Sequence, residues 1–235
     1  MASLDRELKR LLDFGHLEKP VQAHLKNVYA TLSLCLLVAA LGAYIHMFTD
    51  IMQAGFLSAI GALAMILLLV MTPHQPENQT KRLGFLGGFA LLTGLGLGPI
   101  MDAVMIIDPS IIVTAFLGTA AIFVCFSLSA LYNRDRKFLF LGGILLSGLS
   151  WLLMLGLANI FLRSPMIFQI ELYAGFLIMC GFVLYDTQLI IEKRRNGDDD
   201  FIWHCVNLFI DFVNIFRRLM IILASREGDK KKRRN

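Results

Sequence analysis

Residues 201–223 read FIWHCVNLFIDFVNIFRRLMIIL, an apolar stretch that carries one acid, Asp211, near its centre. Its polar side chains recur at intervals of three, four, three and four residues, which places them along one face of a helix. They are His204, Asn207, Asp211, Asn214 and Arg218. Such a helix turns its polar face toward protein or a water-filled cavity instead of lipid. An ionisable residue at membrane depth costs ~2.5–3.5 kcal/mol, so Asp211 marks a candidate functional site.

The whole chain has the composition of a helical membrane protein. Of its 235 residues 57% are apolar, and the charged residues concentrate between long apolar runs. A helix needs about 20 apolar residues to cross a bilayer. Besides the more polar stretch 201–223, the runs that fit are 28–48, 51–71, 83–104, 111–132, 138–161 and 166–191. We therefore predict an all-α, multi-pass membrane protein of six to seven transmembrane helices, with one domain over residues 28–223.

The distribution of lysine and arginine predicts the orientation. Basic residues gather in segment 1–27, at 81–82, at 134–137 and at 193–195, whereas the loops on the other side hold only Arg163. The positive-inside rule then gives a cytosolic N-terminal segment over residues 1–27. If 201–223 spans the bilayer, the tail 224–235 lies on the other side; if it is re-entrant, the tail stays cytosolic. The sequence leaves both alternatives open.

The tail is strongly basic, with five consecutive charges at Lys230, Lys231, Lys232, Arg233 and Arg234. Such a cluster attracts anionic lipids or acidic partners at about 1 kcal/mol per charge near a membrane. Topology anchoring and retention in the endoplasmic reticulum (ER) are the simpler alternatives.

A second acid, Asp186, lies inside the preceding apolar run. Asn196 and Gly197 are typical of a helix stop, and the three aspartates at 198–200 are suited to capping the next helix. Asp186 lies about nine residues before this turn and Asp211 about twelve after it. In two antiparallel helices both acids are then roughly 14–18 Å from the turn, so we expect them to face each other.

Two facing carboxylates make a pH-sensitive latch. About 4 Å apart, at an effective dielectric constant of about 20, they repel by about 4 kcal/mol, so we expect the pair to share one proton. Calcium prefers about six to eight oxygen ligands, so Asp186 and Asp211, with Asn207, Asn214 and waters, would form only a weak, transient site. Weak binding suits conduction, because an ion must also leave. The alternative is a structural hydrogen bond that locks the two helices together.

Other residue types give weaker signals. The cysteines all lie in apolar runs and are expected to be small buried residues: Cys35, Cys125, Cys180 and Cys205. His204 either modulates the latch or marks the membrane boundary. His16, His24 and His74 are expected to be solvated or interfacial, and His46 to form a hydrogen bond. Gly94–Pro99 (GLGLGP) indicates close helix packing or a helix break.

Several segments resemble the Bax inhibitor-1 family. They are GFVLYDTQLIIEK at 181–193, FIWHCVNLFIDFVNIFRR at 201–218, KRLGFLGGFALLTGLGLGP at 81–99, FLFLGG at 138–143 and the basic tail. The resemblance covers nearly the whole chain. It implies seven helices with the last one central, and a pair of aspartates that senses pH, at positions that correspond to Asp186 and Asp211. One departure is Asn207, where close relatives carry an acid, so ion affinity or the pH midpoint could differ.

The resemblance also implies a function and partners. It predicts an ER membrane protein that suppresses cell death, tempers ER stress and lets calcium leak in a pH-dependent way. Calcium would be the transported ion, with no cofactor. Partners that it suggests, besides the lipid bilayer, are Bax/Bcl-type apoptosis regulators, ER stress sensors and further copies of the chain; nucleic acid is not among them.

Two other classes of function share parts of this pattern. A membrane scaffold would suppress cell death through partner binding, without ion flux. Intramembrane aspartyl proteases also pair two acids on consecutive helices, and one lies in a Tyr-Asp motif like Tyr185-Asp186. Their second acid follows Gly-x-Gly, however, whereas Leu208-Phe209-Ile210 precedes Asp211, and their later Pro-Ala-Leu signature is absent. We therefore predict that the protein is not an enzyme.

Overall fold

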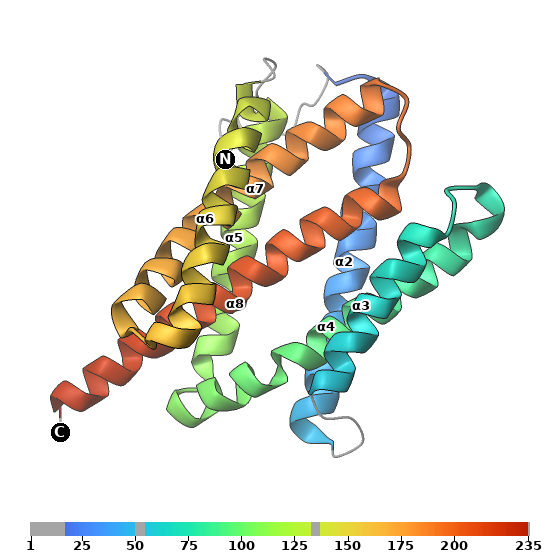
Figure 1. The fold of residues 1–235 in the computed structure, drawn as a ribbon. Coiled ribbons are helices and arrows are strands. Elements are labelled where there is room, and N and C mark those ends of the chain that lie inside the picture. Colours follow the sequence, from blue (N-terminus) through green and yellow to red (C-terminus); the bar gives the residue numbers. More distant parts are fainter. Residues whose placement is uncertain (1–16, 50–54, 133–136, 235) are drawn as a thin grey trace, which may run out of the picture.

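The computed structural model describes residues 17–49, 55–132 and 137–234. Within these ranges all regular structure is helical, which confirms the predicted all-α class (Figure 1). The helices are α2 (Lys19–Phe48), α3 (Phe56–Met71), α4 (Gln79–Ile107), α5 (Ser110–Tyr132), α6 (Leu141–Leu162), α7 (Pro165–Arg195) and α8 (Phe201–Arg234), with short 3₁₀ turns at Pro76–Asn78 and Lys137–Phe140.

The outer surface of this bundle is suited to lipid. Five of the helices, α2, α4, α5, α6 and α7, are long and apolar enough to cross a membrane, and α3 is a shorter apolar helix. Large apolar side chains cover their outer faces: Leu57 is 83% exposed, Ile106 87% and Phe161 86%. Soluble monomers rarely expose so continuous an apolar surface. The protein is therefore a multi-pass membrane protein.

Helices α2 and α8 extend far beyond the apolar runs that predicted them. α2 begins at Lys19, nine residues before the run that starts at position 28. Pro20 is suited to the first turn of a helix, and Val21 and Leu25 are buried against the bundle, so the polar appearance of this segment hides a packed face. At the other end of the chain α8 continues to Arg234.

α8 is the central helix. It packs against α2, α4, α5 and α7, and Leu208, Phe209 and Ile215 are completely buried. Its 34 residues form one unbroken helix, about 50 Å long at ~1.5 Å per residue.

α8 also passes from one end of the bundle to the other (Figure 1). Its first residues lie beside the start of α4, where Arg82 binds Asp200. Near its other end, Lys231 donates a hydrogen bond to the carbonyl oxygen of Ile107, the last residue of α4. Within the bundle, α8 therefore runs from end to end, and the tail lies at the end opposite the α7–α8 turn. That α8 also crosses the bilayer stays a prediction.

Glycines allow α2 and α4 to approach closely. A Cβ atom at Gly94 would lie 1.9 Å from the carbonyl oxygen of Ala39, and one at Gly42 would lie 2.2 Å from that of Leu91. α4 continues through Pro99 without a break. The glycine-rich segment therefore serves helix packing, as one of its two interpretations predicted.

Candidate functional site

The turn between α7 and α8 sets the geometry of the site. Gly197 has φ of 96°, the left-handed region that favours glycine. Its N–H donates to Arg194 O, and the N–H of Asp198 donates to Lys193 O at 3.0 Å, which is the double closure of a Schellman motif. Asp200 then caps α8 by accepting from the N–H of Trp203 at 3.1 Å. The predicted helix stop and cap are both confirmed.

This turn brings the two predicted acids together. Asp186 on α7 and Asp211 on α8 interact directly through their carboxyl groups. Asp211 is 5% exposed, while Asp186 is half-buried. In the described part of the chain, Oδ2 of Asp211 is buried without a hydrogen-bond partner. The contact therefore joins two acids, and one buried acceptor atom is left for a proton, a water molecule or a cation.

The other polar residues of α8 lie in different surroundings. Asn214 donates to Ile210 O at 2.9 Å and accepts from Arg218 at 3.1 Å, so its amide is engaged within α8 itself. Asn207, one turn before Asp211, is half-buried. His204 lies seven residues, about 10 Å along the helix, from Asp211. The structure thus joins the two acids, but it engages Asn214 and His204 elsewhere.

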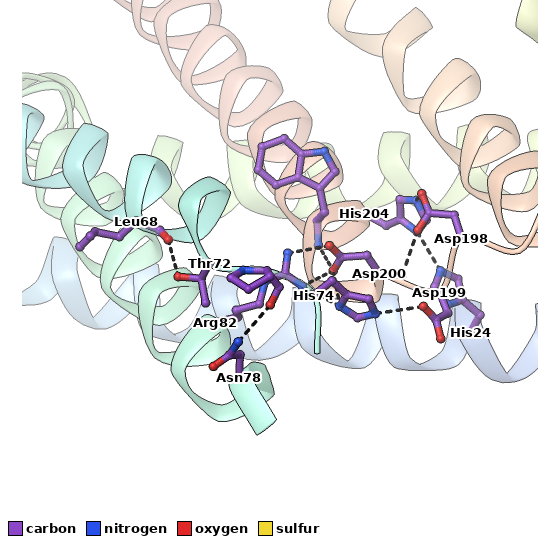
Figure 2. Close-up of polar contacts among 12 residues, drawn as sticks. His24, Leu68, Thr72, His74, Asn78, Arg82, Asp198, Asp199, Asp200 and His204 are labelled. Carbon is purple, nitrogen blue, oxygen red and sulfur yellow. Dashed lines mark hydrogen bonds and ion pairs between the residues drawn. The ribbon is translucent and has the colours of Figure 1, made fainter. Parts of the chain in front are cut away.

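His204 pairs with a histidine of α2 (Figure 2). Nδ1 of His204 is 2.8 Å from Nε2 of His24, and the ring centroids are 5.0 Å apart at 81°. Nε2 of His204 faces Oδ2 of Asp198 at 3.6 Å. His24 is only 6% exposed, so of the two predicted alternatives, solvated or interfacial, the first is wrong. The early start of α2 carries this residue against α8.

A buried ion pair joins α4 to the same turn (Figure 2). Arg82, 4% exposed, donates to both carboxylate oxygens of Asp200 at 2.9 and 2.6 Å. Burial alone would raise the pKa of Asp200, but the Arg82 and Trp203 hydrogen bonds outweigh it and hold that pKa below its usual value. His74 bridges the group, because its ring lies 2.8 Å from the Arg82 guanidinium and 2.9 Å from Asp199.

Sequence reasoning missed this ion pair. It used Arg82 only as a marker of the cytosolic side, and Asp200 only as a cap. The signal that could have found it is the combination of three acids at one helix start with a basic residue in the first turn of another helix. Which two helix starts meet, however, is decided by the packing of the whole bundle.

The remaining predicted residues are placed as follows. His46 contacts Asp102 at 3.1 Å, as the predicted hydrogen bond requires. Three of the cysteines are buried, but Cys125 is exposed. In the tail, Lys230 pairs with Glu227 at 3.2 Å. Outside the described residues lie segment 1–16 with His16, and the side chains of Lys232, Arg233 and Arg234.

A resident metal site does not emerge from the part of the chain that the structure describes. There, no group of three or more His, Cys, Asp or Glu side chains is arranged to hold a metal ion. The acidic pair by itself would offer a cation two carboxylates, fewer oxygens than calcium prefers.

Comparison with known proteins gives a consistent result over the full chain. The family model described as "Inhibitor of apoptosis-promoting Bax1" matches residues 21–228. Bax inhibitor 1 of Mus musculus is 57% identical over 234 residues, which cover 99% of each chain. Bax inhibitor 1 of Bos taurus is 56% identical over 100% of both chains. The plant relative, Bax inhibitor 1 of Arabidopsis thaliana, is 45% identical over 94% of this chain and 88% of its own length.

Proposed function

Because the chain belongs to the family of inhibitors of apoptosis-promoting Bax1, we propose that it suppresses cell death from the ER membrane by passing calcium under the control of pH. The family supports the anti-apoptotic role. The ER location, the relief of ER stress and the calcium leak follow from the resemblance of the motifs around the two acids. A cytosolic N-terminus follows from the positive-inside rule.

The observation that carries the proposal is the contact between Asp186 and Asp211. With one shared proton, the pair holds α7 and α8 together through a charge-assisted hydrogen bond. Without that proton, two carboxylates about 4 Å apart repel by about 4 kcal/mol at an effective dielectric constant of about 20. With a second proton, the charge that strengthens the hydrogen bond is lost. The contact is therefore strongest in one protonation state, and pH sets how much of that state is present.

Calcium enters this scheme as the transported substrate. The doubly ionised pair supplies two carboxylates, and Oδ2 of Asp211 is a buried acceptor with no partner among the described residues. Asn207, half-buried one turn away, is a further oxygen that the sequence places on this face. Few protein oxygens and several waters make a site that binds weakly enough to release the ion.

The test is calcium flux through the purified full chain in proteoliposomes across a range of pH. Wild-type flux should depend on pH, and Asp211→Asn should give flux that no longer does. Asp102→Asn is the matched control, because Asp102 contacts His46 near the end of α4, away from the acidic pair. Equal pH dependence in wild type and Asp211→Asn would overturn the mechanism.

The same preparation separates the channel from a scaffold that acts through Bax/Bcl-type regulators or stress sensors. A scaffold moves no calcium in liposomes that contain no other protein. Its protective effect in cells would be lost on deletion of residues 230–234 and kept in Asp211→Asn. The channel predicts the reverse: flux in pure liposomes, and altered protection in Asp211→Asn.

A further inference from the structure

We propose that His24 and His204 form a proton-operated contact between α2 and α8, separate from the Asp186–Asp211 pair, that opens when both imidazoles are protonated. The two histidines lie beside the α7–α8 turn, together with the other polar contacts drawn in Figure 2. Both rings are buried: His24 is 6% exposed and His204 is 1% exposed.

The hydrogen bond between the two rings requires that one of the two facing nitrogens carries no proton. Nε2 of His24 and Nδ1 of His204 are 2.8 Å apart, so one must carry a proton and the other must accept it. Two neutral rings satisfy this condition, and so do one neutral ring and one imidazolium. When both rings are charged, both nitrogens carry protons and face each other. The hydrogen bond is then replaced by repulsion between two buried cations.

The surrounding charges do not offset a second proton. Asp198 faces Nε2 of His204 at 3.6 Å. Asp199 and Asp200 also act on the pair, but Asp199 already binds His74 and Asp200 binds Arg82. Two cations of α7 oppose further positive charge on the pair: Arg194 acts on His24 and Lys193 acts on His204. Among the described residues, Asp198 is thus the one of these three carboxylates that binds no other cation, and it is opposed by Arg194 and Lys193 of α7.

The start of α2 is the part that can move. The start of α8 is fixed to α4 by the buried Arg82–Asp200 pair, and its first turn is capped by Asp200. By contrast, the other ion pair at the start of α2 joins Glu18 and Arg195 at 3.8 Å, with the Glu18 side chain 67% exposed. Such an exposed pair contributes little. Protonation of both histidines should therefore displace the first turns of α2 from α8.

The test measures the distance between α2 and α8 by double electron–electron resonance. Spin labels are placed at Lys26→Cys on α2 and Ile210→Cys on α8, two exposed positions, after replacement of the four native cysteines by alanine. Spectra are compared at about pH 7 and about pH 4, because burial and mutual repulsion place protonation of both rings below the ordinary imidazole range. We expect one distance population near neutrality and an additional, longer one in acid.

Two variants assign the change to the histidines. His204→Gln keeps a hydrogen-bonding partner for His24 but removes one titrating ring, so its distances should stay the same at both pH values. Asp186→Asn removes the other pH-sensitive contact and should keep the acid-induced population. The same distances at both pH values in the labelled parent, or loss of the change in Asp186→Asn, would overturn the proposal.

Thermal unfolding of the unlabelled protein gives an independent measurement. The midpoint of the wild type should fall more between about pH 7 and about pH 4 than that of His204→Gln. Parallel decreases would contradict the proposed contact, whatever the labels report.

Discussion

Helix α8 takes part in two clusters of ionisable residues, one near its start and one near its middle. The two clusters differ in the sign of the charges that they bring together. At its start, Asp200 is bound by Arg82 and Asp199 by His74. Eleven residues further on, Asp211 meets another acid, Asp186. The first region pairs opposite charges and fixes α8 to α4. The second places two like groups against each other within the bundle.

This difference separates a structural site from a functional one. A buried pair of opposite charges holds two helices in register and is strongly destabilising to break. A pair of acids can be held together only through a proton, so its strength follows pH. Ionisable residues at membrane depth are costly. Because the Asp186–Asp211 pair contains no basic residue to offset that cost, a functional role explains it better than a stabilising one.

Removal of the cation at the start of α8 should have the largest effect on stability. Arg82→Met leaves Asp200 partly buried without its bidentate partner, and we expect a loss of about 3 kcal/mol in the free energy of unfolding. Chemical unfolding in detergent measures it. Lys81→Met, at the exposed neighbouring position, is the control and should change stability by less than about 0.5 kcal/mol. Equal effects of the two substitutions would remove the structural role from this region.

The capping role of Asp200 can be separated from its ion pair. Asp200→Asn keeps an oxygen that can accept from the N–H of Trp203 but loses the charge, whereas Asp200→Ala loses both. We expect the alanine variant to be less stable than the asparagine variant by about 1 kcal/mol. The same unfolding measurement applies. No difference between them would show that the cap contributes nothing to α8.

Neutralisation of the acidic pair should have a smaller effect at neutral pH. Asp211→Asn keeps the shape of the side chain and supplies a donor to Asp186, so we expect the free energy of unfolding to change by less than about 1 kcal/mol. The dependence of stability on pH should become weaker than in the wild type. A loss as large as that of Arg82→Met would instead favour the alternative in which the two acids form a structural lock.

The ion pair should add almost no pH dependence near neutrality. Because the folded-state pKa of Asp200 is lowered, its contribution is complete above the unfolded value of about 3.9 and is lost only as the pH falls through the folded value. In a His74→Gln background, which removes the neighbouring imidazole, Asp200→Asn and its parent should lose stability in parallel between about pH 7 and about pH 5. Their unfolding curves should converge only below about pH 4. Divergence nearer neutrality would contradict the assignment.

The sequence was sufficient for features that depend on local rules. The apolar runs located the helices, Gly197 marked the end of α7, and the distance of each acid from the turn placed Asp186 opposite Asp211. Each of these depends on helix geometry or on a capping preference within a few residues. A hairpin of two helices is short enough for such rules to determine which residues meet.

Contacts between distant helices could not be obtained in this way. His24 lies in a segment that is polar in sequence, and only the packing of α2 against α8 shows that it is buried. Arg82 and Asp200 are 118 residues apart, and either could have faced solvent. Their meeting depends on how the seven described helices pack together, which no local pattern encodes.

The most direct measurement is infrared difference spectroscopy of the carboxyl groups, with wild type and Asp211→Asn compared at neutral pH. If Asp186 and Asp211 share a proton, the wild type should show the C=O absorption of a protonated carboxyl that the variant lacks. Identical spectra in this region would mean that no proton is held between the two acids near neutrality, and the account of a pH-controlled contact would be contradicted.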